Sequence, residues 1–278
     1  MDESSELFAA ITRFDCVDYE KSANLFLRYF PVELAQAALE IMRSQWQDRE
    51  PFYYASSFLL DVGRGLIPRH LFSEEAAAQF IAALYDANLI AILRELLFRP
   101  KWFVRDNTLH TIGRLYLSEG RQLFDELFPW CLAHDPLLLR DLFFEYRWLK
   151  GNVLPLLVVA SNHANFSIRW STLRYLDTRG WKCEQSVKEP YAIILEHLAQ
   201  DPHQLVRAEA QLLNRYAHAE NAEPESQRLL QRELRQLKRK VLVWDAFEAR
   251  FKSAQAAADD YTVAEVEAFV GQLAKQAP

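Results

Sequence analysis

The sequence predicts an all-α protein, and three observations carry this prediction. Half of the residues are hydrophobic and 13% are aromatic, which excludes general disorder. The chain has only seven glycines and eleven prolines, and it is dominated by Ala, Leu, Glu, Gln and Arg, which enter helices at little entropic cost. Apolar residues recur at three- and four-residue steps, clearly so in residues 99–117, whereas the alternation typical of strands is scarce.

The first third of the chain reads as a series of helices with recognisable starts. Residues 6–29 and 32–46 predict two opening helices, and Pro31 stands at the start of the second, where its missing N–H costs little. Pro51 opens the next helix. Ser73, followed by two glutamates, predicts an N-cap with carboxylates at the positive end of the helix dipole.

From Ser73 onward we expect the helices in antiparallel pairs, because one short motif occurs four times. In each second helix an aliphatic residue is followed by arginine, at Val104-Arg105, Leu139-Arg140, Ile168-Arg169 and Val206-Arg207. Successive arginines lie 35, 29 and 38 residues apart, a period typical of α-solenoids with two helices per repeat. One helix pair cannot bury its apolar faces alone, so neighbouring pairs must stack. The residues expected in the core are Val104, Ile112, Leu139, Ile168, Val206 and Leu213.

Two of these openings resemble HEAT repeats, in which an aspartate-proline step precedes the second helix. They are Asp135-Pro136 before Leu139-Arg140 and Asp201-Pro202 before Val206-Arg207. The resemblance covers residues 73–219 and implies an α-α superhelix, a HEAT-like solenoid of antiparallel helix pairs. It also implies that each repeated arginine pairs with an acid or a helix end of a neighbouring repeat.

The C-terminal segment differs from the repeats. We therefore divide the chain into a helical repeat array over residues 1–222 and a C-terminal helical cap over residues 223–278, within the same domain. The cap begins with a charged helix that carries six basic residues: Arg228, Arg232, Arg235, Lys238, Arg239 and Lys240. These residues are interpreted as the solvated outer side of the cap or, alternatively, as a basic ligand-binding edge. Thr262 and Glu265 fit a capping box that starts the last helix.

Charge and residue usage narrow the functional classes. The formal net charge is −6, so the surface as a whole gives no electrostatic drive toward a phosphate backbone. Three cysteines without a CxxC pair, Cys16, Cys131 and Cys183, indicate unpaired thiols and a cytoplasmic protein. The seven histidines form no HxxH or HExxH motif, and we expect no metal and no cofactor. No apolar run is long enough to span a bilayer, so no membrane is expected as a partner.

A candidate binding groove follows from the spacing of aromatic and charged residues in the second helices. Trp102, Asp106 and His110 lie at four-residue steps and share one helix face. The motif arginines Arg140 and Arg169 lie 35 and 64 residues after Arg105, so positions offset by 35 and 64 residues from this helix are the equivalent positions in two later repeats. Second helices usually line the concave side of a solenoid, so the predicted groove comprises Trp102, Asp106, His110, Asp141, Glu145, Trp148, Trp170, Arg174 and Asp177. The alternative is that the tryptophans are buried between repeats.

Part of this stripe also resembles HEAT-like DNA glycosylases, which remove alkylated bases. Trp102 and Asp106 are similar to that family's tryptophan–aspartate step, and Arg140 to its arginine. The resemblance implies that Asp106 would stabilise the cationic sugar while Arg140 holds a phosphate of duplex DNA. Arg174 stands about where the family has a further tryptophan, and the chain is acidic, so the sequence departs from the family on both points.

The sequence therefore favours a non-catalytic scaffold that binds another protein. A small acidic scaffold with an aromatic-lined groove suits an adaptor, or an inhibitor that masks a basic partner such as a toxin. The alternative is an enzyme, the DNA glycosylase acting on alkylated bases. The two hypotheses differ in the local charge they require, because an enzyme acting on DNA needs a positive rim around Asp106.

Overall fold

The computed structural model describes residues 3–12, 19–63, 65, 72–115, 117–177, 185–220, 223–255, 258 and 260–276. Across these ranges every regular element is a helix, sixteen in all, and none is a strand. The predicted all-α class is confirmed. All six residues expected in the core are buried: Val104, Ile112, Leu139, Ile168, Val206 and Leu213.

Contacts divide the chain into two compact units. Unit 1 comprises Met1–Leu127 with Glu145–Gly151, and unit 2 comprises Phe128–Phe144 with Asn152–Pro278. The division falls inside α8 (Gly120–His134) and α9 (Leu139–Trp148). The change from array to cap at residue 222 stays a prediction. The two units are described separately below.

Unit 1 contains α1 to α7 and parts of α8 and α9. The bounds of its first seven helices are α1 Glu3–Thr12, α2 Tyr19–Arg28, α3 Pro31–Ser44, α4 Arg49–Gly63, α5 Glu74–Asp86, α6 Leu89–Leu97 and α7 Trp102–Arg114. Pro31 is the first residue of α3, and the Ser73 hydroxyl accepts the Ala76 N–H at 3.2 Å as the predicted N-cap. The single helix expected over residues 6–29 is wrong, because α1 ends at Thr12, whose hydroxyl donates to the Phe8 carbonyl at 2.9 Å.

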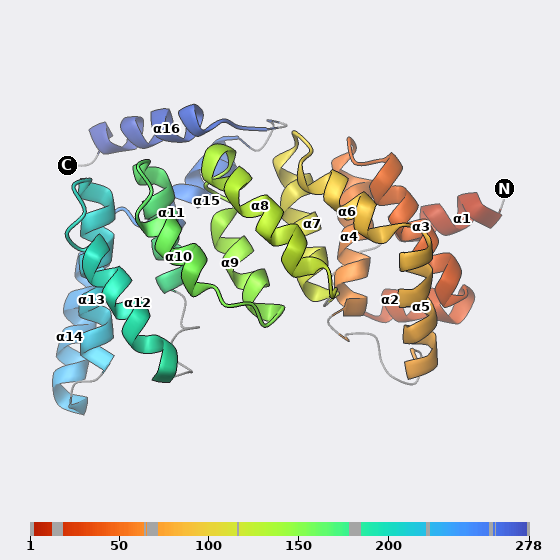
Figure 1. The fold of residues 1–278 in the computed structure, drawn as a ribbon, viewed down its shortest axis with the longest axis horizontal. Helices are drawn as coiled ribbons and strands as arrows, with labels where there is room; N and C mark the ends of the chain where they lie inside the picture. The colour runs from red at the N-terminus through yellow and green to blue at the C-terminus, as the bar shows by residue number, and fades with distance from the viewer. Residues whose placement is uncertain are drawn as a thin grey trace. The chain divides into compact units, whose positions relative to one another are not determined.

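Helices of unit 1 pack both on their chain neighbours and on helices two or three places away in the chain (Figure 1). The helix α3 packs on α4 and α5, and α7 packs on α4 and α6. Aromatic side chains fill much of the space between them. Phe58 meets Phe80 edge-on at 6.0 Å, and Phe52 meets Phe103 edge-on at 6.0 Å. The α4–α7 contact thereby fixes the helix that begins with Trp102.

Unit 2 shows the packing expected of stacked helix pairs. Its pairs are α10 (Leu154–Ser161) with α11 (Phe166–Asp177) and α12 (Gln185–Leu198) with α13 (Gln204–Glu220). The first helices of the pairs also pack on each other, α10 on α12, and so do the second helices, α11 on α13. This two-layer arrangement buries apolar faces that one pair alone would leave exposed.

The C-terminal segment of unit 2 contains α14 (Pro224–Lys238), α15 (Trp244–Ala254) and α16 (Val263–Gln276). The helix α14 packs on α13 through Leu212 and Leu234, whereas α15 packs on α11. The predicted capping box of α16 is confirmed, since Glu265 N–H donates to the Thr262 hydroxyl at 3.2 Å and Thr262 N–H donates to Glu265 Oε2 at 2.6 Å.

The sequence also led to expectations about the cysteines and about membrane spans. Cys131 is buried, while Cys16 and Cys183 lie outside the described residues. Among the described helices none is by itself both long enough and apolar enough to cross a bilayer. The bent pair of α5 and α6 meets that criterion only when the two helices are taken together.

Candidate functional site

Five residues of unit 1 bring part of the predicted groove together. Asp106, His110 and Arg114 lie one turn apart on α7, and Glu145 and Trp148 come from the end of α9. We call these five residues the α7 polar cluster. Four of them were predicted as groove residues, and only Arg114 was not. The signal for Arg114 was available in the sequence, because it continues the four-residue steps from Asp106 and His110.

Glu145 is the buried centre of the cluster, with 1% of its surface exposed. Its Oε1 lies 2.9 Å from His110 Nδ1 and 3.4 Å from Arg114 Nη2. Its Oε2 has no hydrogen-bond partner among the described residues. Gly113 makes room for this carboxylate, since a Cβ at that position would lie 2.0 Å from Oε2. A glycine inside α7 therefore permits an acid of α9 to be buried against it.

Trp148 is the exposed part of the cluster. The Arg114 guanidinium lies 4.8 Å from the centre of the Trp148 ring, in cation–π contact, and 48% of Trp148 is exposed. Arg114 thus contacts the exposed ring and the buried Glu145 carboxylate at once. The buried Glu145 carboxylate therefore holds Arg114, and Arg114 in turn holds the large Trp148 side chain at the surface.

The histidine of the cluster lies between two carboxylates. His110 Nδ1 faces Glu145, and His110 Nε2 lies 3.9 Å from Asp106 Oδ1. The two carboxylates therefore orient the imidazole ring.

Trp102 lies at the start of α7, close to the basic residues Arg49 and Lys101. The Arg49 guanidinium of α4 lies 5.4 Å from the Trp102 ring centre, and Trp102 packs edge-on against Phe103 at 6.4 Å. Lys101 donates to the Gln47 carbonyl at 2.9 Å. Trp102 is therefore half-buried against α4, one turn before Asp106.

Trp170, in unit 2, corrects one groove prediction. Its exposed fraction is 0%, and its ring centre lies 5.0 Å from that of Trp244 and 5.2 Å from that of Phe247. Its indole N–H donates to the buried Glu209 carboxylate at 2.5 Å, and Glu209 also accepts the Trp244 backbone N–H at 2.7 Å. The alternative reading, a tryptophan buried between helices, is the right one here, because α15 covers this face of α11.

The other predicted residues of unit 2 are held by contacts within that unit. Arg174 forms ion pairs with Asp245 and Glu248 of α15. Asp141 is buried and accepts a hydrogen bond from Arg140 Nη1 at 2.5 Å. The Arg140 guanidinium also stacks over Phe144, 4.9 Å from the ring centre. The side chain of Asp177 lies outside the described residues.

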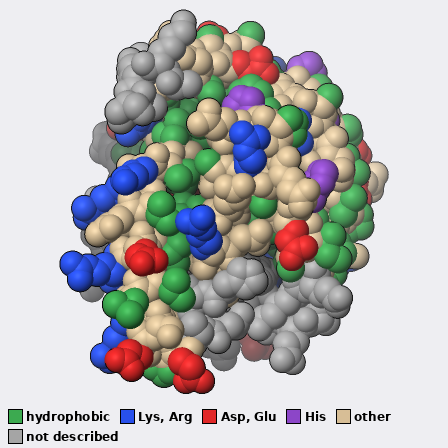
Figure 2. Space-filling view, turned by 90° about the vertical axis from the view of Figure 1, so that its left-hand side faces the viewer, with side chains coloured by type: hydrophobic (Ala, Val, Ile, Leu, Met, Phe, Trp, Pro, Cys, Tyr) green, Lys and Arg blue, Asp and Glu red, His purple; other side chains and the backbone are tan. Residues whose placement is uncertain are grey.

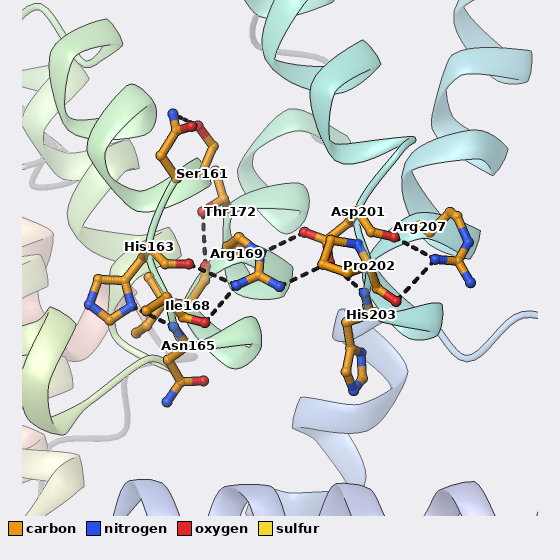
Figure 3. Close-up of polar contacts among 12 residues, drawn as sticks. Ser161, His163, Asn165, Ile168, Arg169, Thr172, Asp201, Pro202, His203 and Arg207 are labelled. Carbon is orange, nitrogen blue, oxygen red and sulfur yellow. Dashed lines mark hydrogen bonds and ion pairs between the residues drawn. The ribbon is translucent and has the colours of Figure 1, made fainter.

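Three of the four repeated arginines make the same structural contact. Each donates to the carbonyl six residues before it, in the turn that follows the preceding helix: Arg105 to Arg99 at 2.8 Å, Arg169 to His163 at 2.7 Å, and Arg207 to Asp201 at 2.5 Å. Arg169 also forms a bidentate pair with Asp201 at 2.6 and 2.9 Å, which links two successive helix pairs (Figure 3). These arginines therefore fix turns and do not present free guanidinium groups.

Beside the Arg169–Asp201 pair lies a shallow pocket of about 690 Å³. The His203 imidazole stacks on the Phe166 ring in its wall, with 3.8 Å between ring centres. Burial lowers the pKa of His203 below its usual value, with Asp201 opposing and the two arginines adding to this effect. Burial opposes ionisation of Asp201, but hydrogen bonds from Arg169 and from the His203 backbone outweigh it and lower its pKa. The sequence analysis did not single out His203.

No family model, curated protein or solved structure matches this chain.

Proposed function

We propose that this protein is a non-catalytic, HEAT-like scaffold that binds another protein through the α7 polar cluster. The observation that carries the proposal is Trp148, a tryptophan half exposed at the surface and stacked on Arg114. Tryptophan and arginine are the residue types that most often dominate the energy of protein interfaces. Such a pair offers a partner a large aromatic surface beside a planar cation.

The cluster is organised before any partner arrives, which supports binding with little loss of side-chain entropy. Glu145 holds both His110 and Arg114 from beneath, and Arg114 in turn fixes the Trp148 ring. A partner therefore meets side chains that already have defined positions. The half-buried Asp106 adds a negative group to this surface. A partner with a basic side chain beside an apolar or planar one would complement it, in line with an adaptor or an inhibitor in the cytoplasm.

The repeated arginine contact, found in both units, and the packing of unit 2 support the HEAT-like part of the proposal. Arg105, Arg169 and Arg207 reach back to the same carbonyl position, and α10–α13 pack in two layers of two. Both features are those of a repeat built from helix pairs, a class of protein whose surfaces are widely suited to binding partners.

A crosslinking experiment followed by affinity measurement tests the proposal. A photoreactive amino acid at the exposed Lys150 position, next to the cluster, would capture the partner in the cells that make this protein. With the purified partner, Trp148→Ala should raise the Kd by about 5- to 1,000-fold, corresponding to about 1–4 kcal/mol. Tyr53→Ala is the matched control, because Tyr53 is a comparably exposed aromatic residue of unit 1. Equal affinity of the Trp148→Ala protein and the wild type would refute the proposal.

The glycosylase alternative has its own assay. Duplex DNA carrying methylated bases should release no base in the presence of this protein if the scaffold proposal is right. Measurable turnover that disappears in Asp106→Asn would instead identify Asp106 as a transition-state stabilising group, and it would replace the proposal.

A further inference from the structure

A row of arginines on α14 forms a second surface, in unit 2 and separate from the α7 polar cluster. Arg228, Arg232 and Arg235 lie on α14, and Arg239 is its C-cap residue with helical dihedral angles of φ −75 and ψ −18. At 100° per residue, steps of four, three and four place the four side chains within an arc of about 60°. All four are exposed. Figure 2 shows Lys and Arg side chains gathered along one edge of this end of the molecule.

The arginine row has no ion-pair partner among the residues that the structure describes. Within the part of the chain that the structure describes, no carboxylate forms an ion pair with any of the four, and Arg235 Nε donates only to the Gln231 carbonyl at 3.2 Å. Glu233 lies in the middle of α14 but is out of register, because the residues three and four positions away from it are leucines and a glutamine. Like charges at these spacings destabilise a helix. Glu225 lies three residues before Arg228, but no ion pair joins the two, and the row therefore carries positive charge that a ligand can neutralise.

The opposite face of α14 is already occupied. Leu234 is buried against Leu212 of α13, and Leu237 packs against the same cluster. The row thus faces away from the α13 contact, and its arginines with Gln236 line a hollow of about 400 Å³. A ligand can reach all four guanidinium groups without disturbing the packing of α14.

We propose that this row binds an acidic helical segment of a partner protein. Glutamates or aspartates at steps of four, three and four on a partner helix would repeat at the same rise as the arginines, about 16 Å from first to last. The guanidinium fork is suited to carboxylates. Leu229, next to the row, is 65% exposed, and a protein partner can cover this apolar side chain whereas a phosphate backbone cannot. The helix also has no aromatic residue on which a nucleic-acid base could stack.

The experiment compares two acidic peptides and two forms of DNA as fluorescent ligands for the full chain. One peptide is a helix with glutamates at four-three-four spacing, and the other has the same composition with the glutamates spread around the helix. The ordered peptide should bind about tenfold more tightly than the redistributed one, and more tightly than single-stranded or duplex DNA of 20 nucleotides. Binding should weaken as salt is raised.

Matched variants locate the binding surface. The double variant Arg232→Gln/Arg235→Gln should weaken binding of the ordered peptide about tenfold, whereas Arg215→Gln/Arg250→Gln, which removes two exposed arginines elsewhere in unit 2, should change it less than twofold. Leu229→Ser should weaken the peptide complex and leave the much weaker DNA binding unchanged. Glutamine keeps helix propensity close to that of arginine, and circular dichroism checks that the fold is retained.

Three results would overturn the inference. Equal binding of the two peptides would show that charge alone, without helical register, is recognised. Equal loss in the two double variants would place the binding elsewhere. Tighter binding of DNA than of the ordered peptide, lost in Arg232→Gln/Arg235→Gln, would make nucleic acid the ligand of this row. None of these outcomes depends on Trp148, so this inference and the proposed function fail independently.

Discussion

Gly113→Ala should change the free energy of unfolding through two physical effects of opposite sign. In the interior of a helix, alanine ordinarily stabilises a protein by about 0.5–1 kcal/mol relative to glycine. In α7 the new Cβ would lie 2.0 Å from Glu145 Oε2 and 2.8 Å from Glu145 Cβ, so α9 as well as the carboxylate must move. Overpacking of this kind costs about 1–3 kcal/mol. Displacing Glu145 from His110 and Arg114 costs a further 1.5–3 kcal/mol, roughly the value of a hydrogen bond to a charged group.

The clash therefore outweighs the helix propensity, and Gly113→Ala should lower the free energy of unfolding by about 2–5 kcal/mol. Urea and thermal unfolding followed by circular dichroism measure this change. Gly271→Ala is the control, because a Cβ at that position in α16 meets nothing within 4 Å, and it should be neutral or stabilising. In a Glu145→Ala background, Gly113→Ala should lose the part of its penalty that comes from the carboxylate, whereas the close approach to the Cβ of residue 145 remains. A Gly113→Ala protein as stable as the wild type would refute the placement of Glu145 against α7.

Two further perturbations test unit 2. Glu209→Ala should destabilise the fold by about 2–6 kcal/mol, because it leaves the Trp170 indole N–H and the Trp244 backbone N–H buried without an acceptor. Glu209→Gln keeps an acceptor oxygen and should cost much less. Equal losses of stability in urea unfolding of the two variants would contradict this account. The pKa of His203 is lower in the folded protein than in the unfolded chain, where it is near 6.5, so protonation favours unfolding. The contribution of His203 to folding stability is therefore complete above pH 6.5 and declines as the pH falls below that value. An NMR titration should place the His203 midpoint below 6.5, and Phe166→Ala should raise it by exposing the ring; a midpoint at or above 6.5 in the wild type would show that burial does not govern this histidine.

Features set by local chemistry could be predicted from the sequence. The Ser73 N-cap, the proline that starts α3 and the capping box at Thr262 each depend on residues within one turn of a helix. The repeated arginine could also be predicted as structural. Its acceptor, a carbonyl after the preceding helix, is six residues away along the chain.

The candidate site could be predicted only in part, and two tryptophans show why. Trp148 and Trp170 were both predicted to line the groove, yet the first is half exposed and the second is fully buried. The difference comes from α15, which brings Trp244 and Phe247 onto α11 from far along the chain. Periodicity indicates which residues share a helix face, but it does not show which later segment covers that face. The burial of Glu145 likewise depends on a glycine of another helix.

The contact of Arg105, Arg169 and Arg207 with a carbonyl six residues earlier has a consequence for how this chain can change in length. Inserting or deleting one residue between the carbonyl and the arginine would turn the side chain by about 100° around its helix and shift it by about 1.5 Å along the axis, away from its acceptor. The stretches 99–105, 163–169 and 201–207 should therefore have a fixed length. Length differences among proteins built on this plan should fall in other connections, and a grafted repeat should retain its function only if it is cut outside these three stretches.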